Sequence, residues 1–166
     1  MITNKAIVTI TVIFTAALLT METANFFKTK KDRPAGISCV DTATFKDHTF
    51  CLELATIRDD QAKGLSGRSS ITETEGMLFG YPTEDYYSFW MKDMLVPIDM
   101  LWLDSNGVVV NLETNVQPPK AGTADSELQV YRPNQKARYV LEIKAGMANK
   151  IGLSLGEKIE LRFNYE

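Results

Sequence analysis

Three side chains between residues 90 and 99 have the chemistry of a ligand site, namely Trp90, Lys92 and Asp99. An indole ring stacks on flat ligand groups, and an ammonium and a carboxylate orient polar ones. The surrounding stretch 75–99 is dense in large apolar residues, as a core or a pocket wall is. A second interpretation stays open, in which Trp90 packs in the core and Lys92 neutralises Asp99 across the end of a strand.

The sequence offers little support for histidine, metal or nucleotide chemistry. His48 is the only histidine and lies far in sequence from residues 75–99, so a Ser-His-Asp or Cys-His system lacks a positioned base. Two cysteines with one histidine leave a zinc sphere incomplete, and the sequence contains no phosphate-binding or calcium-binding loop pattern. We therefore expect no metal and no cofactor, and the sequence identifies no catalytic residue.

The elements that must position these side chains are mostly short strands. Thr56 is expected to cap a short helix over residues 58–65, and residues 147–151 are expected to form one helical turn that Gly152 ends. We expect a mainly β fold, a compact antiparallel β-sandwich or partly closed barrel with this helix and this helical turn. The strands that apolar and polar alternation predicts include residues 49–55, 75–79, 86–91, 138–144 and 157–163, with a turn at Tyr81-Pro82.

The dipeptide Asn106-Gly107 predicts a two-residue type I′ turn in a hairpin formed by residues 97–115. Such a turn determines the register, because each residue before it faces one residue after it. Asp99 would lie at the polar end of an apolar row, where a carboxylate needs a donor or water. The expected pairs are Leu103 with Val110, Leu101 with Leu112 and Asp99 with Thr114.

Cys39 and Cys51 lie symmetrically around Phe45. A hairpin that turns near residues 45–47 would place the two cysteines opposite each other, within reach of a disulfide. Closing this loop would stabilise the fold by about 3 kcal/mol in the chain-entropy model. Two buried free thiols are the alternative. Because disulfides persist mainly in oxidising compartments, the pair favours a domain outside the cytoplasm.

The N-terminus is a separate, membrane-directed segment, since residues 6–21 carry no charge. As a helix they would span about 24 Å, less than a hydrocarbon core of about 30 Å, so length alone does not separate an anchor from a signal peptide. We expect a signal anchor in residues 1–21, a polar tether in 22–36 and one domain in 37–166. A domain secreted after signal cleavage is the alternative, and the basic residues at 28–33 oppose the expected orientation.

Length and charge limit the remaining possibilities. The chain has 166 residues and a net charge of −3, which suits one domain with a sizeable core. Nucleic-acid binding needs clustered Lys and Arg, so this balance argues against a nucleic-acid partner. We expect a monomer.

Several segments together resemble the DUF192 family. KGLSGRSSITETEGMLFGYP, SFWMKDMLVPIDMLWLDSNGVVV and ARYVLEIKAG follow the family's order of a G-L-x-x-R segment, an E-G-M-L-F segment, an F-W-M-K segment with a downstream Pro-x-Asp, and a V-L-E strand. The resemblance covers residues 52–161. It implies a compact β-rich sandwich that is exported or membrane-attached and has no characterised activity.

The resemblance also implies which polar residues recur. The family's recurring polar positions fall on Arg68, Lys92, Asp99 and Glu142, beside Trp90, and we take these five as candidate ligand-binding residues. The chain departs from many relatives in the long polar connection 116–137, which carries no cysteine here. Loops of this length inside compact domains are often functional.

Two functions from different classes follow as expectations. The first is a membrane-tethered extracytoplasmic binding or accessory module of the cell envelope, with an envelope polysaccharide or peptide as its ligand. The alternative is an envelope hydrolase in which Asp99 and Glu142 act as a carboxylate pair.

Overall fold

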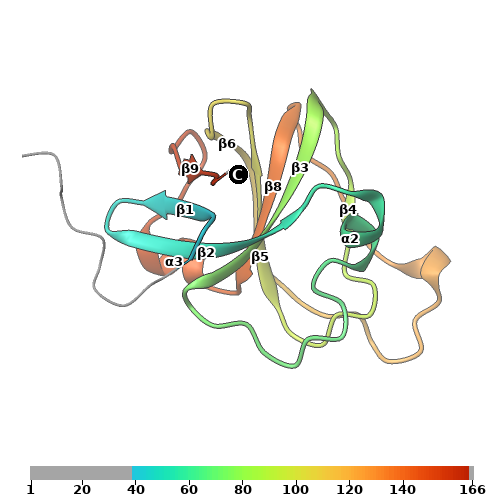
Figure 1. Cartoon of the computed structure of the whole chain (residues 1–166). Helices are drawn as coiled ribbons and strands as arrows, with labels where there is room; N and C mark the ends of the chain where they lie inside the picture. Colours follow the sequence, from blue (N-terminus) through green and yellow to red (C-terminus); the bar gives the residue numbers. More distant parts are fainter. Residues whose placement is uncertain (1–38, 165–166) are drawn as a thin grey trace, which may run out of the picture. The chain divides into compact units, whose positions relative to one another are not determined.

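The computed structural model describes residues 39–164, which form a mainly β domain with two short α-helices (Figure 1). Seven strands form one curled sheet in the order β6-β5-β8-β3-β2-β1-β9, and β4 pairs with β7 in a separate ribbon. The elements are β1 Thr42–Phe45, β2 His48–Ala55, α2 Arg58–Lys63, β3 Glu75–Asp85, β4 Phe89–Trp90, β5 Ile98–Leu103, β6 Val109–Val116, the 3-10 helix η1 Asp125–Glu127, β7 Val130–Tyr131, β8 Ala137–Lys144, α3 Met147–Ile151 and β9 Glu160–Arg162.

The expected anchor and tether, residues 1–21 and 22–36, lie outside the described residues. Between residues 39 and 164 no helix is both long and apolar enough to cross a bilayer.

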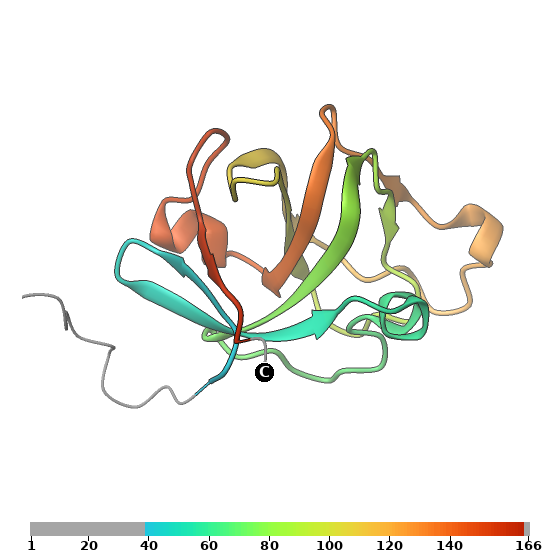
Figure 2. The same ribbon diagram turned by 45° about the horizontal axis from the view of Figure 1, so that its top comes forward.

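The two edges of the seven-stranded sheet approach each other, so the sheet forms a half-barrel (Figure 2). Val109 at the start of β6 donates its N–H to the carbonyl of Glu157 at 2.9 Å, and Ile159 donates to the carbonyl of Gly107 at 2.9 Å. These contacts link the β6 edge to the segment that leads into β9. Of the two predicted architectures, the structure has the partly closed barrel.

The inside of the curl holds one of two apolar clusters. Leu78, Leu101 and Leu141 stand side by side on β3, β5 and β8, because Leu141 is the register partner of both other residues. Phe45 from β1 and Ile159 from the segment before β9 belong to the same cluster. With Val109 from β6 in the same cluster, residues from both ends of the sheet meet in one buried core.

The outer face of the central strands carries the second cluster. It includes Met77, Met100, Trp102 and Val140, which are all buried. The Trp102 indole N–H donates to the carbonyl of Tyr87 at 2.8 Å, which satisfies its polar atom in the core. This face is covered by α2, the segment after it and residues 89–96, and Trp90, Lys92 and Glu142 lie around this covering layer.

The pairing of β2 with β3 is parallel, whereas an antiparallel fold was predicted. Parallel neighbours need a crossover connection, and residues 56–74 supply it together with α2. The predicted cap residue of this helix was wrong, because its N-cap is Ile57 and no side chain caps it. Gly64 ends the helix with a positive φ of 49°, as a C-terminal glycine does.

The hairpin of β5 and β6 keeps part of the predicted register. Leu101 pairs with Leu112, but the predicted type I′ turn is wrong, because only Gly107 of the two turn residues has a positive φ. The Asp104 carboxylate accepts the N–H groups of Asn106 and Val108, each at 2.8 Å, and so supports a longer turn. Bulges follow, so Leu103 pairs with Val109 and Ile98 pairs with Val116 in place of the predicted neighbours.

Two further boundaries differ from the predictions. Strand β3 runs through Pro82 to Asp85, so the turn expected at Tyr81-Pro82 does not occur. The strand expected over residues 86–91 is reduced to β4, and the long connection 116–137 contains η1 and β7. Because β7 pairs with β4, this connection is attached to the segment that carries Trp90.

The hairpin of β1 and β2 confirms the cysteine prediction. Its turn lies between Phe45 and His48, which are register partners. Cys39 and Cys51 form a disulfide, with 5.5 Å between their Cα atoms.

Candidate functional site

Glu142 is a carboxyl group placed in the apolar outer cluster. Its register partners on the neighbouring strands are Met77 on β3 and Met100 on β5, and the residue is only 4% exposed. Strand alternation directs it to the same face as Val140. The residues next to it on both sides are therefore apolar thioethers, which do not solvate a charge.

The Glu142 carboxyl has no compensating partner. Between residues 39 and 164 it forms no hydrogen bond and no ion pair. Burial raises its pKa to about 8, because the charged form loses its hydration without gaining a counter-ion. The group is therefore a neutral carboxylic acid at neutral pH, with an O–H donor and a carbonyl acceptor.

A cavity of about 100 Å³ opens beside this carboxyl. Three of the five candidate residues line it, namely Trp90, Lys92 and Glu142. The other polar side chains of the lining come from the crossover after β2, from β3 and from the approach to β4, and they are Gln61, Lys63, Ser66, Tyr81 and Ser88.

The crossover after β2 forms one wall of the cavity and is held in place by side-chain hydrogen bonds. The Gln61 amide donates to the carbonyls of Ala55 and Gly80, at 3.2 and 3.1 Å, which joins α2 to β2 and β3. The Ser66 hydroxyl donates to the carbonyl of Lys92 at 2.8 Å. This wall is therefore bonded both to the sheet and to the segment that follows β4.

Trp90 of β4 and Lys92 of the segment after it also line the cavity. Trp90 is 48% exposed and is the register partner of Val130, which is 46% exposed. The Lys92 ammonium lies 5.8 Å from the centre of the Trp90 ring and forms an ion pair with Asp125 in η1. This ion pair raises the pKa of Lys92, since it favours the charged form.

Tyr81 is a lining residue that the sequence analysis missed. It lies on β3 in the alternating row that contains Met77 and Phe79, and its ring stacks on Tyr87 with 3.5 Å between ring centres. Burial, together with the nearby Tyr87 and Glu142, raises the pKa of the Tyr81 phenol to about 12. Extending the β3 alternation past Gly80 would have found this residue.

Asp99 does not line this cavity. Its register partner is Ile143, so it points to the opposite face of the sheet from Glu142. It is fully buried and accepts three backbone N–H groups, from Asn115 at 2.8 Å, Gly146 at 3.0 Å and Ala148 at 2.8 Å. These hydrogen bonds attach the end of β6 and the start of α3 to β5. Asp99 therefore has a structural role.

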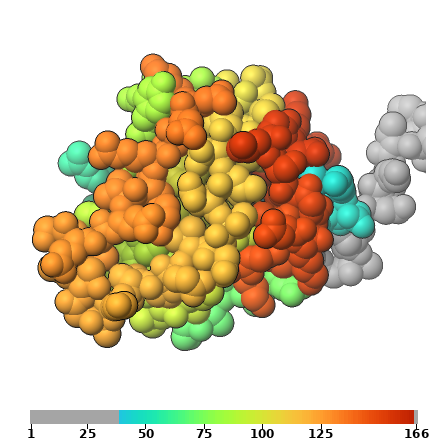
Figure 3. All heavy atoms as spheres, turned by 180° about the vertical axis from the view of Figure 1, so that it is seen from behind, coloured from blue at the N-terminus to red at the C-terminus, as the bar shows by residue number. Residues whose placement is uncertain are grey.

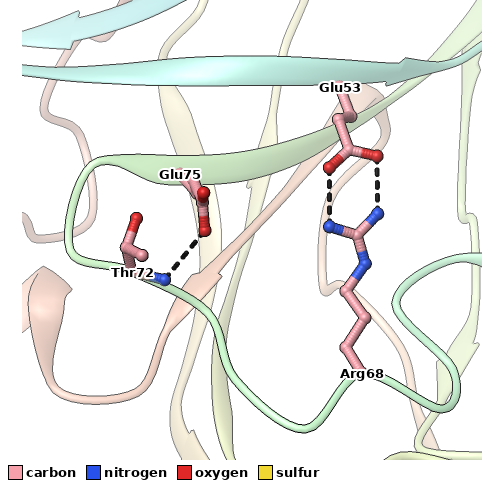
Figure 4. A network of polar contacts seen from close by, with 4 residues as sticks. All are labelled: Glu53, Arg68, Thr72 and Glu75. Atoms are coloured by element: carbon pink, nitrogen blue, oxygen red, sulfur yellow. Dashed lines mark hydrogen bonds and ion pairs between the residues drawn. The ribbon is translucent and has the colours of Figure 1, made fainter.

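Arg68 also lies apart from the cavity lining. Its guanidinium forms a two-pronged ion pair with Glu53 on β2, at 2.6 and 2.5 Å (Figure 4). This hydrogen bonding lowers the pKa of Glu53 and raises that of Arg68. In the same view the N–H of Thr72 donates to Glu75 at 3.0 Å, so both contacts secure the crossover against the strands.

A larger cavity of about 530 Å³ lies between β6 and the connection 117–131. Figure 3 shows this side of the molecule, where the connection lies beside β6. None of the five candidate residues lines it. Among the described residues, no three His, Cys, Asp or Glu side chains gather as they would around a metal ion.

The chemistry available at the Glu142 cavity is binding through donors. A neutral carboxyl, a phenol and two lysines surround a small space, beside a half-exposed indole. Nothing in this set is an activated nucleophile with an adjacent base.

The chain is similar to other proteins both in its fold and in its sequence. Among solved structures with a similar fold is a candidate transcription regulator from Sinorhizobium meliloti 1021, which is 25% identical with a TM-score of 0.64; the match covers 76% of this chain and 98% of the other. Another is a protein of unknown function from Novosphingobium aromaticivorans DSM 12444, which is 30% identical with a TM-score of 0.63; that match covers 78% of this chain and 89% of the other. No curated protein matches the chain. The model of DUF192, described as "Uncharacterized ACR", matches residues 40–161, and the chain belongs to this family.

Proposed function

We propose that this chain is a binding or accessory domain of the cell envelope, tethered by residues 1–21 and held outside the cytoplasm. Its ligand site is the Glu142 cavity. The observation that carries this proposal is the convergence of Trp90, Lys92 and Glu142 on one cavity. The Cys39–Cys51 disulfide supports an oxidising location, since disulfides are rare in the cytosol.

The exposed apolar surface beside the cavity favours a polysaccharide as the ligand. Trp90 lines the cavity and is the register partner of Val130, and because both are about half exposed they offer an apolar area beside the cavity. Such an area suits the C–H face of a sugar ring, while the cavity receives a polar substituent. A peptide is the other ligand class, and the experiments below distinguish it.

The geometry does not favour the hydrolase. Glycosidase carboxyls flank one bond from the same side of a cleft, whereas Asp99 and Glu142 point to opposite faces of the sheet. We also propose a monomer with no nucleic-acid partner, because the net charge of −3 opposes binding to phosphates.

Fluorescence provides a direct test of the site. We expect soluble peptidoglycan fragments or chitooligosaccharides to change the emission of Trp90. The emission of Trp102 should stay constant, because this residue is fully buried. The variant Trp90→Phe should lose the response. Leu95→Ala, which removes an exposed apolar side chain outside the cavity lining, should keep it. An equal response in Trp90→Phe, or no response to any sugar or peptide of a broad panel, would contradict the proposal.

A further inference from the structure

The ligand group that enters the Glu142 cavity can be identified by its charge and size. Resting on the proposed function, we infer that the cavity takes a carboxylate, carried by an acidic sugar whose ring lies against Trp90 and Val130.

The charged groups around the cavity favour an anion. Among the described residues, the ionisable groups of the lining are Lys63 from α2, Tyr81 from β3, Lys92 after β4 and Glu142 itself. Lys92 is offset by Asp125, but Lys63 forms no ion pair among residues 39–164. With Glu142 and the phenol both neutral, the lining has a net positive charge at neutral pH.

The neighbours of Glu142 along the sheet do not alter this balance. Met77 and Met100 flank it on β3 and β5, and both are uncharged. The next residues in this row are Glu53 on β2, whose charge is paired with Arg68, and Glu113 on β6. Neither acid lines the cavity, and Asp125, which pairs with Lys92, does not line it either.

Hydrogen bonding gives a second reason. A carboxylate only accepts, and the neutral Glu142 has an O–H that no group between residues 39 and 164 accepts. An O–H donated to an ionised oxygen is about twice as strong as a neutral hydrogen bond. The Tyr81 phenol and the Ser88 hydroxyl are further donors in the same lining. An ammonium ligand would instead face Lys63 and Lys92.

Size supplies the third reason. A space of about 100 Å³ is well below the roughly 300 Å³ at which pockets for whole small molecules begin. A carboxyl group has three heavy atoms and fits this space, whereas a sugar ring does not. The ring must stay at the mouth, where Trp90 and Val130 are exposed.

Matched acid and ester pairs test this inference by Trp90 fluorescence. At pH 6 we expect N-acetylmuramic acid to bind about tenfold more tightly than its methyl ester, and glucuronic acid more tightly than methyl glucuronate. The affinity for the acids should fall about tenfold by pH 9, as Glu142, with a pKa of about 8, ionises. Glu142→Gln, which donates an amide N–H at every pH, should lose this dependence.

Other outcomes separate the inference from the proposed function. Equal or tighter binding of the esters, or affinity that rises with pH, would overturn the carboxylate assignment while leaving sugar binding intact. If the dipeptide Ala-Ala gives a response but its amide and the sugars do not, the bound carboxylate belongs to a peptide. That result would overturn the acidic sugar as the ligand. No response to any of these six probes would overturn the carboxylate assignment, whereas the proposed function fails only if the peptidoglycan fragments and chitooligosaccharides also give no response. Glu113→Gln is the matched control, because Glu113 lies in the same row but outside this cavity.

Discussion

Two buried carboxyl groups on adjacent strands of this domain have opposite surroundings. Asp99 accepts three backbone N–H groups, and these hydrogen bonds join two distant segments. Glu142 receives none among residues 39–164 and lies between two methionines. A buried polar group without a partner costs stability, and such costs are tolerated mainly at functional sites. The same amino-acid class thus has a structural role at one position and a candidate binding role at the other.

The Glu142 carboxyl should make stability fall as pH rises. Its pKa is raised from the ordinary 4.5 to about 8, so between these values the folded protein holds a proton that the unfolded chain releases. The unfolding free energy should therefore decrease with a limiting slope of about 1.4 kcal/mol per pH unit, and the loss should be complete above pH 8. Urea unfolding at pH 5, 6.5 and 8 measures it.

The control for this prediction is the neutral variant Glu142→Gln. Its stability relative to the wild type should increase from pH 5 to pH 8, because only the wild type carries the linked proton. Glu113→Gln should follow the wild-type curve. A constant difference between Glu142→Gln and the wild type would show that the buried carboxyl has an ordinary pKa.

At the scale of elements, the turn between β5 and β6 contacts the segment before β9 and so helps to join the two edges of the half-barrel. Gly107 has a φ of 81°, and a Cβ added there would lie 2.4 Å from the carbonyl oxygen of Ile159. Its own carbonyl accepts the N–H of Ile159 at 2.9 Å. The turn between β5 and β6 therefore requires glycine for its backbone conformation and also for the close approach of the segment before β9.

Gly107→Ala should open this contact. The positive φ and the steric overlap together should lower the unfolding free energy by about 3 kcal/mol and speed hydrogen exchange at the Ile159 N–H. Gly122→Ala isolates the backbone cost, since Gly122 has a similar φ of 82° with nothing within 4 Å of its added Cβ. It should cost only about 1 kcal/mol. Equal effects of the two variants would show that the close approach does not matter.

Alternation along single strands predicted much of the element pattern. It placed β8 and put Val140 and Glu142 on one face, as the structure has them. The predicted turn at Pro82 was wrong. Proline usually marks a turn or the end of a strand, but here it lies between Gly80 and Asp85, where β3 has no register partner. A proline lacks an N–H, and at such a position no ladder bond is lost.

Contacts between distant segments account for the remaining errors. Asp104 reshapes the Asn106-Gly107 turn through its side chain, which a dipeptide rule does not include. The donors that Asp99 receives from Gly146 and Ala148 are 47 and 49 residues away, so its structural task could not be read from its neighbours. The sequence predicted five residues in one ligand site. The fold brings three of them together at one cavity on the outer face near β4, namely Trp90, Lys92 and Glu142.

At the scale of the whole domain, the disulfide should matter for stability and not for the cavity. Replacing both cysteines by serine should lower the unfolding free energy by about 3 kcal/mol, because the unfolded chain gains conformational freedom. The Trp90 response to ligand should persist, since neither Cys39 nor Cys51 lines the Glu142 cavity. Urea unfolding and the fluorescence titration measure the two properties, and loss of binding in a folded double variant would contradict this separation.

The pairing of β1 with β9 brings the first and last described strands together. Thr42 is the register partner of Arg162, and the N–H of Asn164 donates to the Asp41 carboxylate at 3.0 Å. The domain therefore begins and ends at one point of its sheet. A short peptide could join these two points, and new ends could be cut at Gly122 in the connection 117–131. Such a circularly permuted domain would keep every strand pair and would carry its new ends on the side that bears the larger cavity.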